Sequence, residues 1–185
     1  STLMKSVRKL EPGEIIEIDL QKPVLSPKAY WDVPEPDPNI TKLSPRDWED
    51  LIDQQIKSSV KRQLISDVPL GAFLSGGVDS SLIVSAMGNA ETFSIGFDDP
   101  TYNELKWARK VADHLNLNHK DEIIKPDIVA LFSHLMHFLD DPIGDFSIFP
   151  TYLVSKLARE HVTVALSGDG GDELFGGYET YLADN

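Results

Sequence analysis

The sequence feature that most restricts the fold is a pair of glycine-rich segments, each directly following a short apolar run. Residues 69–74 read Pro-Leu-Gly-Ala-Phe-Leu and lead into Ser-Gly-Gly-Val-Asp-Ser-Ser at 75–81. Residues 162–166 read Val-Thr-Val-Ala-Leu and lead into Ser-Gly-Asp-Gly-Gly-Asp-Glu at 167–173. Short apolar runs bounded by glycine are typical of buried strands. Both glycine-rich segments are therefore predicted to begin where a strand ends.

The chain between and around these segments alternates between strand and helix patterns. Further strands are predicted at 92–97 and 119–124, and helices from near Ser80 to near Met87, at about 127–139 and at 148–160. Another helix is predicted from its apolar face, which consists of Leu105, Ala108, Val111, Ala112 and Leu115. Strands alternating with helices of this length predict the α/β class, a parallel sheet flanked by helices. Ligands of such sheets bind beyond the carboxyl ends of the strands.

The first 40 residues differ in pattern from the rest. Residues 14–20 alternate in polarity at the period of a strand, and residues 34–38 hold three prolines, as a linker would. Ser44 and Pro45 then have the residue types of a helix N-cap and first helical position. An apolar stripe follows on that helix, formed by Trp48, Ile52, Ile56, Val60 and Leu64. We expect residues 1–40 to end one domain and residues 41–185 to form a second.

Charge narrows the classes of partner. Thirty acidic against 17 basic residues give a net charge of −13, which disfavours nucleic acid and anionic membranes. The chain has no cysteine, which excludes disulfides and a thiol nucleophile within it. It shows no signal peptide and no apolar stretch long enough to span a membrane, so a cytoplasmic location is expected. Phosphates bound here would need backbone amides, a metal ion or local basic side chains, which favours a requirement for Mg²⁺.

The segment at 75–81 has the chemistry of an anion site. Its glycines allow a tight turn, and the helix after them directs unpaired N–H groups and a positive dipole end at that turn. Three serines add hydroxyl donors, and Asp79 suits a phosphate site if it holds a metal ion. The alternative is a plain glycine turn in which Asp or Ser caps the next helix. The strand before it and the helix after it favour the anion site.

No Gly-Lys-Ser or Gly-Lys-Thr is present, so this is not a Walker loop. The segment resembles instead the Ser-Gly-Gly-x-Asp-Ser loop of the ATP pyrophosphatase (PP-loop) superfamily, which implies the adenine nucleotide alpha hydrolase-like fold and cleavage of ATP between its α and β phosphates. The resemblance implies that Asp79 helps to hold Mg²⁺ and that the pyrophosphate oxygens contact Ser75, Gly76, Gly77, Ser80 and Ser81. The strand at 92–97 resembles the superfamily's adenine-binding strand, with Leu74 and Ile95 flanking the base. Asn103 and Glu104 continue the resemblance.

The segment at 167–173 carries three acids within five residues on a glycine-rich, flexible backbone. Such a cluster repels itself, which favours a Mg²⁺ site or a general base. Gly171 breaks the register of an EF-hand calcium loop, and a solvated acidic turn remains the plain alternative. The segment resembles asparagine synthetases and the related β-lactam synthetases, as does Pro-Thr-Tyr-Leu at 150–153. The resemblance implies that Ser167 and Gly168 contact AMP, that Asp172 joins Asp79 at Mg²⁺, and that Asp169, which is glutamate in many relatives, acts near the reacting carbonyl.

This family resemblance implies an amide ligase. The parent enzyme would adenylate the side-chain carboxylate of aspartate with ATP, which releases pyrophosphate, and ammonia released from glutamine would then displace AMP to give asparagine. Residues 1–40 resemble the end of the family's glutaminase domain, and the segment supplying a pyrophosphate-binding lysine would follow residue 185, so this chain is expected to bind nucleotide only. The alternatives are a β-lactam synthetase-like or other adenylating ligase, and a non-catalytic nucleotide- or partner-binding module. Whether the chain forms a homodimer stays open.

Overall fold

The computed structural model describes residues 2, 4–22, 26–99, 103–125, 127–140 and 144–183. Its helices are α1 (Pro45–Gln63), α2 (Val78–Met87), α3 (Leu105–Leu115), α4 (Ile128–Met136), α5 (Ile148–Arg159), α6 (Gly171–Phe175) and α7 (Thr180–Ala183), with a short 3-10 helix η1 (Ile40–Lys42). Its strands are β1 (Glu14–Ile15), β2 (Lys28–Ala29), β3 (Leu70–Phe73), β4 (Glu91–Phe97), β5 (Asn118–Ile124) and β6 (Val164–Leu166). The order of elements is the predicted alternation of strands and helices.

The main sheet has the strand order β5-β4-β3-β6, and every pair in it is parallel. Strand β3 therefore lies between β4 and β6, with Ala72 opposite Thr92 on one side and Leu166 on the other. Because all four strands point the same way, the segments that follow β3 and β6 leave the sheet at the same edge. This topology brings the two glycine-rich segments together, although about 90 residues separate them in the chain.

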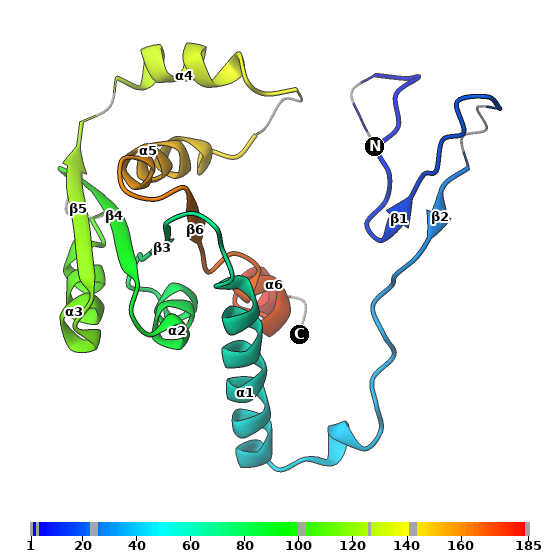
Figure 1. Ribbon diagram of the computed structural model, residues 1–185, viewed down its shortest axis with the longest axis horizontal. Helices are drawn as coiled ribbons and strands as arrows, with labels where there is room; N and C mark the ends of the chain where they lie inside the picture. The colour runs from blue at the N-terminus through cyan, green and yellow to red at the C-terminus, as the bar shows by residue number, and fades with distance from the viewer. Residues whose placement is uncertain are drawn as a thin grey trace.

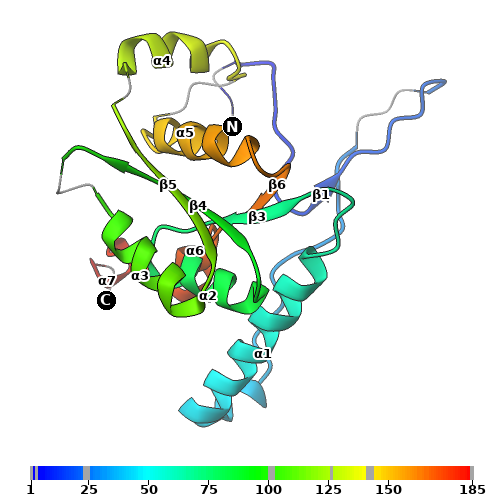
Figure 2. The ribbon, with the colours of Figure 1, turned by 60° about the vertical axis from the view of Figure 1, so that its left-hand side comes forward.

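Helices cover both faces of this sheet, which confirms the predicted α/β class. Figure 2 shows α4 and α5 above the sheet and α2 and α3 below it. The core on the α2 and α3 face contains Val60 of α1 together with Ala72, Leu74, Val84, Met87, Ala90, Ala108 and Ala112. A smaller core on the α5 face joins Phe93, Ala158 and Val162. The sheet therefore lies between two layers of helices, and each layer packs on it through its own core.

Helix α1 begins as predicted. The Ser44 hydroxyl accepts a hydrogen bond from the Asp47 amide at 3.2 Å, and the Asp47 carboxylate accepts one from the Ser44 amide at 3.3 Å. This capping box satisfies donors that a helix start otherwise leaves unpaired. The predicted apolar stripe is buried toward the C-terminal end of the helix, where Val60 is only 4% exposed, whereas Trp48 at the start is 36% exposed.

The predicted strand over 14–20 is wrong in extent. Only two residues form a ladder, with Glu14 opposite Ala29 and Ile15 opposite Lys28. Ile18 and Leu20 are 53% and 91% exposed, so the alternating pattern finds no apolar surface to cover among the described residues. Figure 1 shows this segment running apart from the main sheet. The division into domains at residue 40 stays a prediction.

Two boundaries differ from the sequence prediction. Helix α2 starts at Val78 and not near Ser80, because Gly77 takes the extended N-cap conformation. The second glycine-rich segment is not flexible throughout, since Gly171 opens the short helix α6 after Gly170 adopts a left-handed conformation with φ of 92°. Within the described residues, no helix has the length and apolar character needed to cross a membrane.

Candidate functional site

The turn after β3 is shaped by the tight packing of Gly76 against α3. Gly76 has a left-handed φ of 85°, and a Cβ placed on it would lie 2.5 Å from the backbone nitrogen of Ala108. Other residues would be strained in this conformation and would also displace α3. Glycine at this position therefore lets the turn lie directly on the start of that helix.

Hydroxyl groups hold the turn in shape. The Oγ atoms of Ser75 and Ser80 are 3.0 Å apart, and the Gly77 amide donates to Ser75 Oγ at 3.2 Å. Ser81 Oγ donates to the Gly77 carbonyl at 2.6 Å, closing the first turn of α2. Ser80 is 8% exposed, whereas Ser75 is exposed. The serines thus share a network in which Ser75 is the member most accessible to a ligand.

The second glycine-rich segment packs directly on the first. A Cβ at Gly168 would lie 2.7 Å from the backbone nitrogen of Ser80, and a Cβ at Gly171 would lie 2.5 Å from Asp79 Cγ. Both glycines are therefore needed for the two segments to touch. The structure brings together the loops that the sequence predicted separately.

A cavity of about 440 Å³ lies where these segments meet. From the first segment it is lined by Ser75, Gly77, Val78, Asp79 and Ser80, and from the second by Ser167, Gly168, Asp169, Gly170, Asp172 and Glu173. Phe73, Thr151, Val154 and Tyr178 complete its wall. Gly76 and Ser81, which were also predicted to contact phosphate, do not line it. Gly76 instead packs on α3, and the Ser81 hydroxyl binds within its own helix turn.

Four carboxylate side chains line this one cavity, those of Asp79, Asp169, Asp172 and Glu173. Asp169 Oδ2 accepts a hydrogen bond from Ser167 Oγ at 2.9 Å. No group of three or more histidine, aspartate or glutamate side chains among the described residues is arranged to hold a metal ion by itself. Mg²⁺ is commonly bound by one or two carboxylates together with phosphate oxygens and water. The donor set of this cavity therefore fits Mg²⁺ that arrives with a polyphosphate.

A second, mostly apolar cavity of about 220 Å³ adjoins the first. Leu74 and Ile95, the two residues predicted to flank a base, both line it. The two cavities share Phe73, Ser75, Thr151 and Val154, so they meet at the end of β3 and beside α5. An apolar cavity next to a polar one at a strand end suits a ligand with a flat base at one end and charge at the other.

Three polar residues that line the polar cavity had no individual role in the sequence prediction: Tyr178, Glu173 and Thr151. Tyr178 donates a hydrogen bond from its hydroxyl to Glu173 Oε1 at 2.6 Å. This bond raises the pKa of Tyr178 to about 12 and holds the pKa of Glu173 below its usual value. Thr151, on α5, lies at the junction of the two cavities. Its segment was noticed in the sequence only as a family resemblance, because periodicity does not show which face of a helix meets a strand end.

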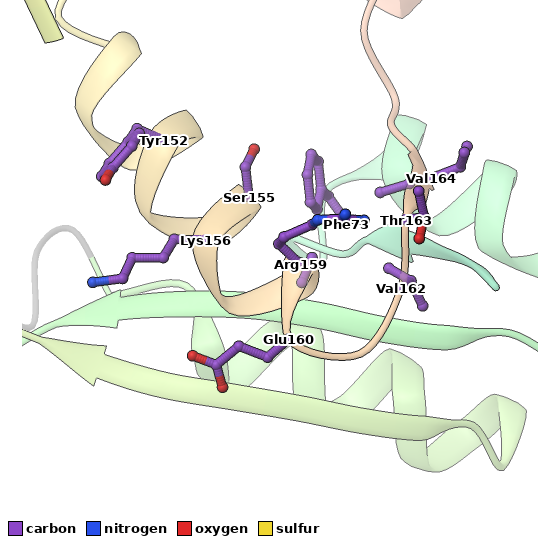
Figure 3. Close-up of a pocket in the computed structure, with 11 residues that line it drawn as sticks. Phe73, Tyr152, Ser155, Lys156, Arg159, Glu160, Val162, Thr163 and Val164 are labelled. Carbon is purple, nitrogen blue, oxygen red and sulfur yellow. The ribbon is translucent and has the colours of Figure 1, made fainter. Parts of the chain in front are cut away.

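A larger cavity, of about 700 Å³, lies between α5 and the edge strand β6 (Figure 3). Lys156 of α5 and Glu160, the residue that follows this helix, extend to one side, whereas Arg159 points toward Phe73 and Thr163. This hollow contains none of the glycine-rich segments and no helix start. Size alone therefore does not make it the nucleotide site.

This chain is similar to several known proteins. The family model described as asparagine synthase matches residues 51–185. A relative from Methanocaldococcus jannaschii is 40% identical over 98% of this chain, which spans 36% of that protein's length. Asparagine synthetase (glutamine-hydrolyzing) 1 of Bacillus subtilis is 38% identical over 98% of this chain, which spans 29% of its length. A solved structure, NH3-dependent NAD synthetase from Campylobacter jejuni, is 18% identical with a TM-score of 0.47, covering 70% of this chain and 60% of that one.

Proposed function

Because the chain belongs to the asparagine synthase family, we propose that it forms the ATP-binding and adenylating part of an amide ligase that converts aspartate to asparagine. The chain spans about a third of the length of its curated relatives. The complete reaction, including release of ammonia from glutamine, is proposed for the longer protein. Binding of Mg²⁺ and ATP is proposed for the residues described above.

One observation carries this proposal. The two glycine-rich segments, distant in the chain, touch at Gly168 and Ser80 and enclose a polar cavity that opens beside an apolar one. The polar cavity receives the N-terminal end of α2, whose free N–H groups favour negative charge. The proposed ligand therefore places its phosphates between the segments and its adenine between Leu74 and Ile95.

The residues divide into four proposed roles. Ser75, Gly77 and Ser80 contact the pyrophosphate part of ATP through hydroxyl and amide groups, and Ser167 and Gly168 contact the AMP part. Asp79 and Asp172 hold Mg²⁺, which neutralises the phosphates in a chain with a net charge of −13. Asp169 is proposed to lie near the reacting carbonyl, because the hydrogen bond that it accepts from Ser167 fixes its carboxylate.

The proposed chemistry has two displacements. A side-chain oxygen of aspartate attacks the α-phosphorus of ATP, the bond from this phosphorus to the bridging oxygen breaks, and pyrophosphate leaves. The nitrogen of ammonia then attacks the acyl carbon, the bond from carbon to the AMP oxygen breaks, and asparagine and AMP are released. The attacking nitrogen loses a proton, for which the Asp169 carboxylate is the proposed acceptor.

Calorimetric titration with a non-hydrolysable ATP analogue, with and without Mg²⁺, tests the binding part. Wild-type chain is expected to bind only with Mg²⁺, and Asp79→Asn and Asp172→Asn are each expected to weaken binding at least tenfold. Asp67→Asn, an exposed residue that lines neither cavity, is the matched control and should bind as wild type does. Equal affinity in all four proteins would reject the proposed phosphate and metal site.

The catalytic part is tested on the full-length protein. Aspartate, ATP, Mg²⁺ and ammonia should give asparagine, AMP and pyrophosphate in equal amounts, and Asp169→Asn should slow asparagine formation. Formation of ADP and phosphate in place of AMP and pyrophosphate would contradict the adenylation step.

A further inference from the structure

The apolar cavity has one charged side chain on its wall, that of Glu104. Glu104 is the N-cap residue of α3, and its carbonyl oxygen accepts hydrogen bonds from the amides of Trp107 at 2.8 Å and Ala108 at 3.2 Å. Its side chain does not cap the helix. Within the part of the chain that the structure describes, this carboxylate accepts no hydrogen bond and forms no ion pair. The main chain thus fixes Glu104, while its exposed side chain stays available to a ligand in the cavity.

The location of Glu104 distinguishes the two ends of the cavity. Ser75 and Thr151 line both cavities and so mark the passage toward the phosphates. Glu104, with Ile95 and Phe97, lines only the apolar cavity. A nucleotide with its phosphates in the polar cavity therefore extends its base away from Ser75 and toward Glu104.

The other polar side chains on the wall of the apolar cavity have few hydrogen-bonding atoms available to a base. The buried hydroxyl of Ser94 already donates to the carbonyl oxygen of Leu74. Ser75 belongs to the hydroxyl network of the loop, and Thr151 lies at the passage. At the base end of the cavity, Glu104 is the one side chain with a free acceptor among the described residues.

We propose that the Glu104 carboxylate accepts a hydrogen bond from the exocyclic amine of adenine and thereby selects ATP over GTP. This inference rests on the proposed function, because it assumes that the cavity binds a nucleotide base. An ionised carboxylate only accepts hydrogen bonds. Adenine presents an amine donor at the position where guanine presents a carbonyl oxygen, so guanine would place an acceptor against a negative charge. Charge-assisted bonds of this kind correspond to roughly ten- to hundredfold in affinity.

Binding of three nucleotides, each with Mg²⁺, tests the inference by calorimetry. ATP is compared with GTP and with purine riboside triphosphate, which has the purine ring without the amine. Wild-type chain is expected to bind ATP at least tenfold more tightly than either analogue. In Glu104→Ala, ATP should bind about tenfold more weakly and no better than purine riboside triphosphate.

Glu104→Gln separates hydrogen bonding from charge. A glutamine amide both accepts and donates, so it should retain most of the affinity for ATP and also gain affinity for GTP by donating to the guanine oxygen. Glu49→Ala, which removes an exposed carboxylate on α1, is the control and should leave all three affinities unchanged. Thermal unfolding of each variant verifies that α3 remains folded.

The outcomes separate this inference from the proposed function. If wild-type chain binds no nucleotide, the proposed site fails and the role of Glu104 fails with it. In another outcome, ATP binding depends on Mg²⁺ and Asp79 while Glu104→Ala keeps the wild-type ratio between the affinities for ATP and for purine riboside triphosphate. That result overturns only the present inference. A loss in Glu104→Ala of discrimination against 2′- or 3′-deoxy-ATP, with the base ratio unchanged, would overturn it in favour of a ribose contact.

Discussion

Gly171 lies so close to Asp79 that a Cβ placed on it would be 2.5 Å from the Asp79 carboxyl carbon. This contact connects the two glycine-rich segments at the carboxylate proposed to hold Mg²⁺. It means that the position of Asp79 depends on a residue about 90 positions away in the sequence. Packing between the segments and nucleotide binding should therefore change together.

Substituting alanine at Gly168 or Gly171 tests this dependence. Each added methyl group must displace α2 or Asp79, and overpacking of this kind typically costs about 1–3 kcal/mol of stability. Binding of the ATP analogue with Mg²⁺ should weaken at least tenfold in both variants. Gly144→Ala is the matched control, because a Cβ at Gly144 meets no atom within 4 Å. Wild-type binding by Gly171→Ala would show that Asp79 tolerates displacement and has no fixed role.

Filling the apolar cavity should block the base. Ile95→Trp places an indole into a cavity of about 220 Å³ that adenine is proposed to occupy. ATP affinity is expected to fall more than tenfold, about 1.4 kcal/mol, in the same titration. Ile65→Trp, at a position that is 88% exposed, controls for the added aromatic group. Undiminished binding by a folded Ile95→Trp protein would place the base elsewhere.

The ion pair between Arg109 and Asp121 should support the fold against acid. Arg109 Nε donates to Asp121 Oδ1 at 3.0 Å, and this guanidinium holds the pKa of Asp121 below its usual value. The stabilisation is present above the unfolded pKa of about 3.9 and is lost as the pH falls through the lower folded pKa. We expect urea unfolding between pH 6 and pH 2 to show that the free energy of unfolding falls less with acidification in Arg109→Gln than in wild type.

Lys57→Gln is the control for Arg109→Gln, since it removes one partner of an ion pair with Asp53 in which both side chains are more than half exposed. In this variant the free energy of unfolding should fall with acidification as much as it does in wild type. Equal pH dependence in Arg109→Gln and wild type would mean that the guanidinium does not stabilise the folded Asp121 carboxylate.

His119 should also make the fold less stable in acid, but in a higher pH range than Asp121. Its Nδ1 lies 2.9 Å from Thr92 Oγ1, while Nε2 is buried without a hydrogen-bond partner among the described residues. Burial lowers the pKa of His119, partly offset by nearby Asp121 and Asp113 and reinforced by Arg109. The unfolded chain therefore binds more protons, so stability should be complete above pH 6.5 and fall as the pH drops below this value.

Urea unfolding between pH 8 and pH 5 measures this loss, and His119→Gln is expected to remove it. His114→Gln, on an exposed position of α3, controls for removal of an imidazole. If stability falls by the same amount in His119→Gln, other titrating groups cause the loss.

Local patterns were sufficient to predict the sheet and the first loop. The apolar run before Ser75 and the helix pattern after Asp79 act over a few residues, and parallel strands place both glycine-rich segments at one edge. Contacts across the fold could not be predicted in this way. Nothing local to Gly168 indicates that it packs on Ser80. The pattern at 14–20 failed for the same reason, because alternation reports a strand only where a partner surface exists.

The edge of the sheet has a consequence for how the chain behaves in solution. Within the described residues, β6 pairs with β3 alone, and its outer side adjoins the hollow of about 700 Å³ beside α5. An open strand edge is a template for pairing between molecules. The net charge of −13 opposes the approach of two copies, and salt screens this repulsion over a Debye length of about 10 Å at 0.1 M. The same chain should therefore remain dispersed at low ionic strength and self-associate as salt is added. The salt concentration of the buffer would then decide whether the protein stays dispersed.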